Sequence, residues 1–410
     1  MTDPTRAVVA FGMPFTGHLH RMMPVVAGLS EAGVPVHVFT DECARGDVER
    51  AGARFVNLFS RCPYAEVDPA TSKPVSGWCV TFAGLYGDDV VRDVEALRPG
   101  LVLHDTVALI GRVVAYHLRI PRVAIRLGQT FDPQQLLRQY ESDPSVAASV
   151  SDRCRAAVGL LLERHGIPDA SPFSAFTDPG GDLNLYSEPP EFVSTRPGEP
   201  PDTVEYFGSL WPASHTRPAA TPSPFGPDTG DRRRIYISFG TAIWVKCATE
   251  ATAALEVLAD AIAEIPSVAA LISLGGRDDS GAAVRLARPN VRVETYVDQI
   301  RVLQEAAVYV THHGLNSTHE AIYYGVPMIS YPFLWDQPGI AARCQELGIA
   351  TPLVSRLQGP VTSMDVHAAL DRILSGGEPL RRRLATARQW ELDVIARRPA
   401  VIRRITALIA

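Results

Sequence analysis

The stretch 308–331, VYVTHHGLNSTHEAIYYGVPMISY, decides the fold. Residues 308–310 form a short apolar run rich in β-branched side chains, which predicts a buried strand of a parallel sheet. A polar loop follows, and then a helical pattern runs over 318–324 and ends at Gly325. The apolar run after Gly325 predicts a second strand. A strand, a loop, a helix and a strand in this order are typical of a doubly wound α/β domain.

The start of this helix predicts a site for an anion. The first backbone amides of a helix have no partner within it, and their partial positive charge favours an anion. Gly314 lets the backbone approach that anion, His312 can donate a hydrogen bond or a charge, and the hydroxyls of Ser317 and Thr318 match phosphate oxygens. A second interpretation stays open, because Ser317 and Glu320 have the spacing of a capping box that would only close the helix start.

The sequence HHGLNSTHE, followed by GVPMISYP and then by Asp336 and Gln337, resembles the donor-binding signature of a known family. This family comprises nucleotide-sugar-dependent glycosyltransferases with two Rossmann-like domains, the GT-B fold. The similarity is greatest to the family 1 branch with plant natural-product and bacterial macrolide glycosyltransferases. It runs from about residue 291 to residue 348 in one register. The resemblance implies an α/β protein with two doubly wound domains facing across a cleft.

The same resemblance implies further contacts with the donor. A Gly-Thr turn follows the predicted strand 234–239 and would lie against the diphosphate, although a plain strand-ending turn explains it equally well. The family's Trp-x-Pro-Gln, whose aromatic ring stacks on the base, corresponds to residues 296–299, and Asp298 replaces the proline. Asp336 and Gln337 would hold the transferred sugar. The residues assigned to the donor are Gly240, Thr241, Tyr296, Val297, Gln299, His312, Gly314, Asn316, Ser317, Thr318, Glu320, Asp336 and Gln337.

The N-terminus predicts a second Rossmann-like opening. Residues 7–12, AVVAFG, form an apolar run of strand length, a helical stretch covers about 20–32, and 36–40 predicts the next strand. No G-x-G-x-x-G motif is present, which argues against a nicotinamide or flavin cofactor. His18 follows the first strand, where doubly wound sheets place their chemistry. A histidine at a helix start is also often a polar cap, and His20 is a nearby rival that fits a solvent-facing position.

Asp105 is predicted at the same sheet edge as His18. It follows the strand-like run 101–103, and a carboxylate in this place can hold an imidazole in one tautomer. Asp105 could instead cap the next helix, and His104 could be the residue that turns inwards. The family pattern G-H followed by five residues and proline matches residues 17–24. The resemblance therefore implies that His18 is the catalytic base and Asp105 its partner.

The function implied by the resemblance is inverting, metal-independent sugar transfer. The donor would be a UDP- or TDP-sugar, and the acceptor a hydroxyl of a small apolar or aromatic molecule of bacterial natural-product or antibiotic biosynthesis. The sequence contains no Asp-x-Asp motif, the usual metal-binding pair of the other large glycosyltransferase fold. Two alternatives are a nucleotide-sugar 2-epimerase-like isomerase and a non-catalytic helper protein. Aromatic residues could line an acceptor pocket or belong to the core: Phe59, Tyr64, Trp78, Phe82, Tyr86, Phe131, Tyr140, Phe173 and Phe176.

Length and composition set the remaining expectations. The 410 residues suffice for two domains, which we place at 1–210 for the acceptor and 231–395 for the donor. A linker would span 211–230, and a helix at 396–410 would cross back to the first domain. The six cysteines lack metal-binding spacing, the net charge is -6, and no apolar stretch has membrane-spanning length. We therefore expect a cytoplasmic monomer or homodimer without cofactor, metal, nucleic acid or integral membrane segment.

Overall fold

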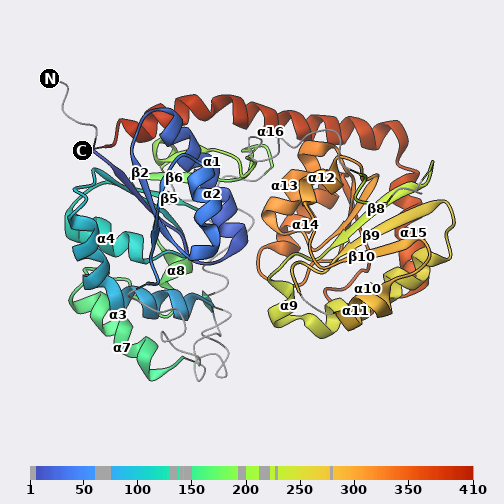
Figure 1. Cartoon of the computed structure of the whole chain (residues 1–410), viewed down its shortest axis with the longest axis horizontal. Coiled ribbons are helices and arrows are strands. Elements are labelled where there is room, and N and C mark those ends of the chain that lie inside the picture. The colour runs from blue at the N-terminus through green and yellow to red at the C-terminus, as the bar shows by residue number, and fades with distance from the viewer. Residues whose placement is uncertain are drawn as a thin grey trace. The chain divides into compact units, whose positions relative to one another are not determined.

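The chain folds into two compact units, seen in the computed structural model of Figure 1. Unit 1 comprises Met1–Pro190, Ser194–Trp211 and Val394–Ala410, and unit 2 comprises Glu191–Val193 and Pro212–Asp393. The structure describes residues 6–60, 75–126, 128, 137–138, 142, 150–192, 200–211, 222–226, 230–277 and 280–409. Most of the linker predicted at 211–230 lies outside these described residues.

Unit 1 is built on a parallel sheet of seven strands in the order β3-β2-β1-β4-β5-β6-β7. Each strand pairs in parallel with its neighbours, as the apolar runs predict. The first strand therefore lies in the interior of the sheet, between β2 and β4. The strands are β1 Val8–Phe11, β2 Val36–Thr40, β3 Arg54–Asn57, β4 Leu101–Asp105, β5 Arg122–Ile125, β6 Leu183–Tyr186 and β7 Val204–Tyr206.

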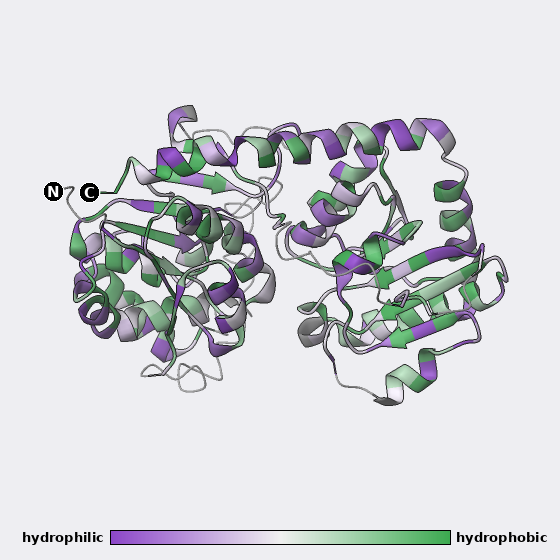
Figure 2. Cartoon of the chain, turned by 45° about the horizontal axis from the view of Figure 1, so that its top comes forward, coloured by the Kyte–Doolittle hydropathy of each residue, from purple (hydrophilic) through white to green (hydrophobic). Residues whose placement is uncertain are grey.

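Helices cover both faces of this sheet. The side chains of β1 alternate: Val8 and Ala10 pack on the face that α1 and α2 cover, and Val9 and Phe11 pack on the face of α3, α4 and α7. Figure 2 shows the resulting hydrophobic strands. The helices of unit 1 are α1 Thr16–Glu31, α2 Arg45–Arg50, α3 Val75–Glu95, α4 Ile110–Leu118, α7 Asp152–Glu163 and α8 Ser174–Thr177, with 3-10 turns at Glu42–Ala44 and Pro201–Thr203.

Unit 2 repeats the design with a parallel sheet of six strands in the order β10-β9-β8-β11-β12-β13. Its strands are β8 Arg233–Ser238, β9 Val268–Ser273, β10 Val291–Glu294, β11 Val308–Thr311, β12 Met328–Ser330 and β13 Ala350–Pro352. Its helices are α9 Ile243–Lys246, α10 Ala248–Ala263, α11 Ser280–Leu286, α12 Gln299–Leu303, α13 Leu315–Tyr324, α14 Gln337–Glu346 and α15 Ser363–Leu374. One continuous core joins this sheet to its helices. The predicted fold class, two doubly wound α/β domains, is confirmed.

The last helix, α16 Gly377–Thr406, belongs to both units. Its residues up to Asp393 are part of unit 2, and those from Val394 onward are part of unit 1, where Val401, Ile402 and Ile405 join the core. Among the described residues, no helix combines the length and the apolar character needed to cross a membrane.

Candidate active site

Both sheets have a point at which the order of the strands reverses. In unit 1 the first strand, β1, lies beside β4, and in unit 2 the first strand, β8, lies beside β11. Connections that leave two such strands in opposite directions open a crevice at the carboxyl edge, where doubly wound sheets bind their ligands. The predicted catalytic residues follow β1 and end β4, and most of the predicted donor residues follow β8 and β11. Each unit thus has most of its predicted residues at its own reversal point.

His18, in the first turn of α1, is bonded to Asp105, the last residue of β4. The distance from His18 Nδ1 to Asp105 Oδ1 is 2.8 Å. Because an ionised carboxylate only accepts hydrogen bonds, we assign the tautomer in which Nδ1 carries the proton and donates it. The Asp105 side chain is fully buried, whereas 28% of the His18 side chain is exposed. This tautomer leaves the lone pair on Nε2, which can accept a proton from a substrate.

Arg21, one helical turn after His18, completes this group. Its Nε and Nη2 donate to Oδ2 of Asp105 over 3.0 and 2.7 Å. Nη2 also lies 2.7 Å from His18 Nδ1, but because a guanidinium only donates, this contact is no hydrogen bond in the tautomer assigned to His18. The amide of Val107 donates to Oδ1 of Asp105 over 3.0 Å. Burial by itself would raise the pKa of Asp105, but the charge of Arg21, followed by His18 and the Val107 amide, holds this pKa well below its ordinary value. Asp105 therefore stays ionised and can orient the imidazole.

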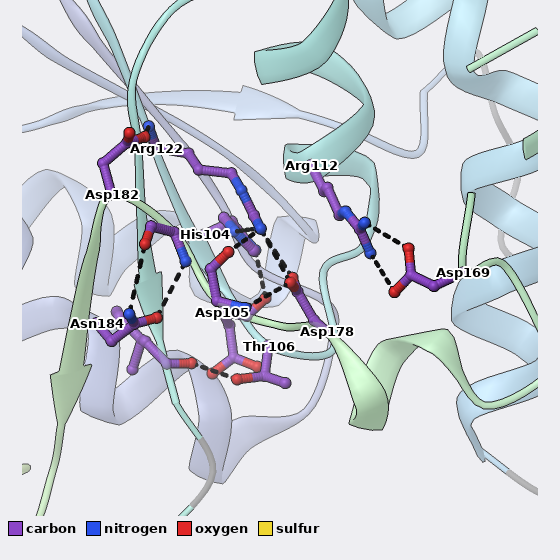
Figure 3. Close-up of polar contacts among 12 residues, drawn as sticks. His104, Asp105, Thr106, Arg112, Arg122, Asp169, Asp178, Asp182 and Asn184 are labelled. Atoms are coloured by element: carbon purple, nitrogen blue, oxygen red, sulfur yellow. Dashed lines mark hydrogen bonds and ion pairs between the residues drawn. The ribbon is translucent and has the colours of Figure 1, made fainter. Parts of the chain in front are cut away.

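The two rivals of His18 lie elsewhere. His104 points to the opposite face of the sheet, as the neighbour of an inward residue in a strand must. Its Nε2 lies 3.1 Å from Arg122 Nη1, and Arg122 is paired with the buried Asp178 at 2.9 Å (Figure 3). Burial, followed by the charge of Arg122, lowers the pKa of His104 to about 4. The alternative in which His104 turns towards the site is therefore wrong. His20 is exposed, as expected.

The capping interpretations of His18 and Asp105 are also wrong. Helix α1 begins at Thr16 with Phe15 at its N-cap, and α4 begins at Ile110 with Leu109 at its N-cap. His18 lies inside its helix, and the backbone amide that donates to the Asp105 side chain is that of Val107, in the turn that precedes α4. Both side chains are thus free to serve each other rather than a helix end.

Aromatic side chains connect His18 with the core of unit 1. The ring of Phe15 lies 5.8 Å from the His18 ring and 6.3 Å from that of Trp78. Trp78 stacks on Phe82 at 6.0 Å, and Phe59 packs against both. Phe59, Trp78 and Phe82 are buried core residues. Three other predicted acceptor residues, Tyr64, Phe131 and Tyr140, lie outside the described part of the chain.

The helix after β11 begins earlier than its sequence pattern predicts. The N-cap of α13 is Gly314, with extended backbone angles, and Leu315 already belongs to the helix because its side chain packs into the core. Ser317 therefore lies in the first turn, and the capping box proposed for Ser317 and Glu320 is wrong. The amides of residues 315–317 have no acceptor within the helix, since the first intrahelical bond runs from Thr318 N to Gly314 O. They lie where the sequence predicts the anion site.

His312 lies between two glycines at this helix start. A Cβ on Gly240 would meet its Nε2 at 2.7 Å, and a Cβ on Gly314 would meet it at 2.6 Å, so only glycine fits at either position. The ring is buried, and its Nδ1 has no partner among the described residues. Burial lowers the pKa of His312 to about 4. The imidazole is therefore neutral at pH 7, and the expectation that it could supply a charge is corrected: it can offer a hydrogen bond only.

Gln299 supports the donor helix instead of reaching a ligand with its side chain. Its Oε1 accepts from the hydroxyls of Tyr236 and Tyr309 at 3.1 and 3.2 Å. Its Nε2 donates to Ser317 Oγ at 3.1 Å and to Glu320 Oε2 at 2.5 Å. Burial raises the pKa of Glu320 to about 7. All the hydrogen-bonding capacity of the Gln299 side chain is therefore used within unit 2, to tie α12 to α13.

The residues before Gln299 occupy the carboxyl end of β10. Asp298, which replaces the family's proline, caps α12 by accepting the amide of Arg301 at 3.3 Å. The ring of Tyr296 is 65% exposed and can offer a flat apolar surface to a base. Val297, between them, is half-buried and packs against the core of unit 2. The replacement of the family's proline by Asp298 therefore leaves a loop that is held in one conformation by the cap of α12.

The two residues predicted for the sugar differ in their surroundings. Asp336 occupies the N-cap position of α14 without a capping side-chain bond. Gln337 is buried, and its Oε1 accepts from the amides of Phe333 and Leu334 at 2.9 and 3.2 Å. The carbonyl of Gln337 therefore holds the loop after β12, and only its amide nitrogen can serve a ligand.

Sequence reasoning missed Arg21 and the two tyrosines beneath Gln299. Arg21 could have been found, because it stands three residues after His18 on one helix face. Tyr236 and Tyr309 stack at 4.7 Å on neighbouring strands, and no motif signals this pairing. It follows from the register of β8 and β11.

One group among the described residues could in principle ligate a metal ion: Asp88, His117 and His165. His117 Nε2 and His165 Nδ1 are 2.9 Å apart, and their ring centroids are 5.2 Å apart. The centroid distance exceeds the distance between the nitrogens by about the sum of the two ring radii. Each nitrogen therefore lies close to the line that joins the two centroids, and the two nitrogens point at each other. This is the geometry of an N–H···N hydrogen bond, in which neither lone pair is directed at a shared ion.

Comparisons with known proteins concern the class of protein to which this chain is similar. Residues 213–379 match the family described as UDP-glucoronosyl and UDP-glucosyl transferase. A Bacillus subtilis (strain 168) protein described as the uncharacterized UDP-glucosyltransferase YdhE is 23% identical over 351 residues, which cover 83% of this chain and 84% of the relative. The solved structure of the glycotransferase of kitacinnamycin has a TM-score of 0.79 and 22% identity over 100% of both chains. That of glycosyltransferase VinC in complex with DTDP has a TM-score of 0.66 and 19% identity, covering 98% of this chain and 99% of that one.

Two doubly wound units are the architecture of the GT-B fold, which this chain shares with the similar solved glycosyltransferases. Within unit 2, residues 213–379 match the UDP-glucoronosyl and UDP-glucosyl transferase family. The resemblance predicted from the donor signature is thereby confirmed.

Proposed function

We propose that this glycosyltransferase moves a sugar from a UDP- or TDP-sugar to a hydroxyl of a small, largely apolar natural product, with inversion at the anomeric carbon. The observation that carries the proposal is the 2.8 Å bond between His18 Nδ1 and the ionised Asp105 at the reversal point of unit 1. A histidine fixed in this tautomer, with Nε2 available, is a general base for a hydroxyl.

In the proposed step, Nε2 of His18 takes the proton of the acceptor hydroxyl while the oxygen attacks the anomeric carbon. The bond from that carbon to the diphosphate oxygen breaks, and its electron pair leaves with the nucleoside diphosphate. Attack from the face opposite the leaving group inverts the configuration. Asp105 stabilises the imidazolium that forms, as a carboxylate does in hydrolase triads.

Unit 2 would receive the charge that develops on the leaving diphosphate. The amides at the start of α13 point at the position of an anion, and an N–H of the neutral His312 adds a hydrogen bond. Preorganised donors of this kind stabilise developing charge, so we propose that the transfer needs no metal ion. The family match over unit 2 supports a nucleoside diphosphate as the ligand.

The surroundings of His18 support an apolar acceptor. The ring of Phe15 packs beside the imidazole, and the buried Trp78 packs against Phe15 from the core of unit 1. Rings of this kind bury apolar area at low entropic cost. The names of the similar solved structures, which refer to kitacinnamycin and calicheamicin, point to complex natural products as the class to test.

A transfer assay with His18→Ala tests the base. We expect kcat to fall by about 10²–10⁴-fold with donor binding unchanged, which is the usual contribution of a general base. The matched control is His20→Ala, two residues away on the exposed side of α1, which should retain activity. Transfer near the wild-type rate in His18→Ala would exclude the base assignment. Stabilisation of the wild type by UDP or TDP in a thermal-shift screen tests the donor separately.

A further inference from the structure

The back of the donor helix α13 carries a buried pair that the proposed mechanism does not use. His319 Nδ1 lies 2.6 Å from Oε1 of Glu391 in α16. Both side chains are almost completely buried, at 0% and 1% exposure. The ring of Phe192 packs edge-on against the His319 ring, with the ring centroids 4.8 Å apart. We call His319, Glu391 and Phe192 the back anchor.

The back anchor joins α13 to two segments at which the chain crosses from one unit to the other. Phe192 is part of Glu191–Val193, which belongs to unit 2 although the residues on either side belong to unit 1. Arg343 of α14 fixes this segment by donating from Nε to Phe192 O at 2.7 Å. Glu391 lies three residues before Val394, where α16 becomes part of unit 1. The helix that bears the predicted diphosphate site is thus held from behind at two such passages.

Stability alone is a poor explanation for an ionisable pair in this place. Replacing a buried ion pair by apolar residues of similar volume is often neutral or stabilising, because both groups lose their hydration on burial. Burial of Glu391 also costs free energy of folding, since its Oε2 has no hydrogen-bond partner among the residues that the structure describes. A short, directional bond differs from apolar packing in one respect: it fixes how a helix is rotated and shifted against its neighbour.

Rotation matters for α13 because it has only ten residues. His319 stands one turn beyond residues 315–317, whose amides form the anion site, so a rotation at His319 turns these amides by the same angle. Misplacement by about 1 Å can cost two orders of magnitude where groups must be aligned with a substrate. The network of Gln299 holds α13 from the side of α12, and the back anchor holds it from the side of α16.

We propose that His319 and Glu391 are positioning residues that aim the amino end of α13 at the donor diphosphate, so that donor affinity depends on their bond and acceptor affinity does not. The proposal rests on the proposed function, because it assumes that α13 binds the diphosphate. It adds two residues to the determinants of donor binding: His319, which lies within the donor signature but was not assigned to the donor, and Glu391, which lies outside the signature.

Three variants separate positioning from stability. Glu391→Ala removes the bond and leaves a cavity. Glu391→Gln retains an acceptor for His319 and should preserve donor binding. The double change His319→Leu and Glu391→Leu keeps an apolar contact, so it should fold with a melting temperature close to the wild type. For Glu391→Ala and for the double variant, we expect the dissociation constant of UDP to rise about tenfold or more.

Calorimetric titration with UDP and steady-state kinetics with both substrates provide the readouts. The KM for the donor should rise in the two variants that lose the bond, and the KM for the acceptor should stay within about twofold. The matched control is Glu305→Ala, which breaks the 2.7 Å pair with Arg234 in the same unit and should leave UDP binding unchanged. Hydrogen exchange at residues 315–318 of the unliganded protein should be faster in Glu391→Ala than in the wild type.

The outcomes distinguish this inference from the proposed function. If the wild type binds neither UDP nor TDP, the proposed function fails, and this inference fails with it. If the wild type binds UDP and the folded double variant binds it equally well, only the positioning role is overturned. An equal rise in the KM of donor and acceptor, or an equal effect of Glu305→Ala, would likewise reduce the back anchor to a general structural role.

Discussion

Arg21 and Asp105 form a buried ion pair in which two guanidinium nitrogens lie 3.0 and 2.7 Å from a single carboxylate oxygen. The other oxygen of Asp105 remains for His18, 2.8 Å away. The two oxygens therefore have different partners: Oδ2 is paired with the guanidinium of Arg21, and Oδ1 orients the imidazole of His18. Without Arg21, burial would favour the protonated acid, which would no longer hold His18 in the productive tautomer.

The first prediction concerns Asp105→Asn. The amide keeps the volume of the side chain but loses the charge that stabilises the imidazolium, so kcat should fall by about 10²-fold. The KM for the donor should not change, because the residues predicted to bind the donor belong to unit 2. Steady-state kinetics provide the measurement. Asp178→Asn is the control, since it removes another buried carboxylate of unit 1, the partner of Arg122, and should affect stability but not kcat.

The second prediction concerns Arg21→Met. Leaving Asp105 buried without its cation should lower the free energy of unfolding at pH 7 by about 3 kcal/mol. In the wild type the pKa of Asp105 is depressed, so its stabilising contribution is present above the unfolded pKa of about 4 and is lost only below it. In the variant the pKa rises, and protonation relieves the unpaired charge at a higher pH.

The stability difference between wild type and Arg21→Met should consequently shrink from pH 7 to pH 5, as measured by urea unfolding. Arg50→Met, which removes an exposed partner of Asp47, should cost less than about 1 kcal/mol at either pH. A difference for Arg21→Met that is the same at both values of pH would contradict the role assigned to the arginine.

The third prediction concerns the glycines that enclose His312. In Gly314→Ala the new Cβ would stand 2.6 Å from His312 Nε2, so the ring must move and the donor loop with it. We expect the KM for the donor to rise by about tenfold or more. Gly325→Ala is the matched control: Gly325 has a φ of +69° and no neighbour within 4 Å, so alanine there carries only the backbone cost of about 1 kcal/mol. A donor KM that is raised equally in both variants would argue against contact with His312 as the cause.

The fourth prediction is a loss of stability in mild acid. Burial, the largest cause in each case, lowers the pKa of His104 and of His312 to about 4 and that of His313 to about 3. At pH values between these folded-state pKa values and the unfolded pKa of about 6.5, the unfolded chain binds more protons than the folded protein does. The free energy of unfolding therefore falls as the pH falls. Each group should contribute about 1 kcal/mol per pH unit.

Urea unfolding at pH 7, 6 and 5 measures this slope. His104→Gln should reduce the slope by the equivalent of about one proton, because glutamine does not titrate. An unchanged slope in His104→Gln would mean that His104 is not neutral in the folded protein.

Much of this protein could be read from short stretches of sequence. Apolar runs predicted the central strands, since a parallel strand buried on both faces must be apolar along its length. Gly325 marked the end of α13, where it adopts a left-handed conformation. His18 and Asp105 were predicted at one sheet edge, because the carboxyl ends of parallel strands lie together whatever the loops between them do.

The tertiary structure decided what each polar group touches. Ser317 and Glu320 fit a capping box in sequence, but the burial of Leu315 extends the helix and makes Gly314 its N-cap. Gln299 resembles a ligand-binding residue in sequence, yet the stacked Tyr236 and Tyr309 occupy its carbonyl. Such contacts join residues far apart in the chain.

The sequence by itself therefore determined the doubly wound fold, the resemblance to a family and the sheet edges at which the predicted site residues lie, because periodicity and local motifs encode strands, helices and turns. Only the tertiary structure decided that Arg21 keeps Asp105 ionised, that His312 is neutral, and that His319 meets Glu391 behind the donor helix. Charge states and hydrogen-bond partners depend on burial and on distances across the fold, and neither quantity exists until the chain has packed.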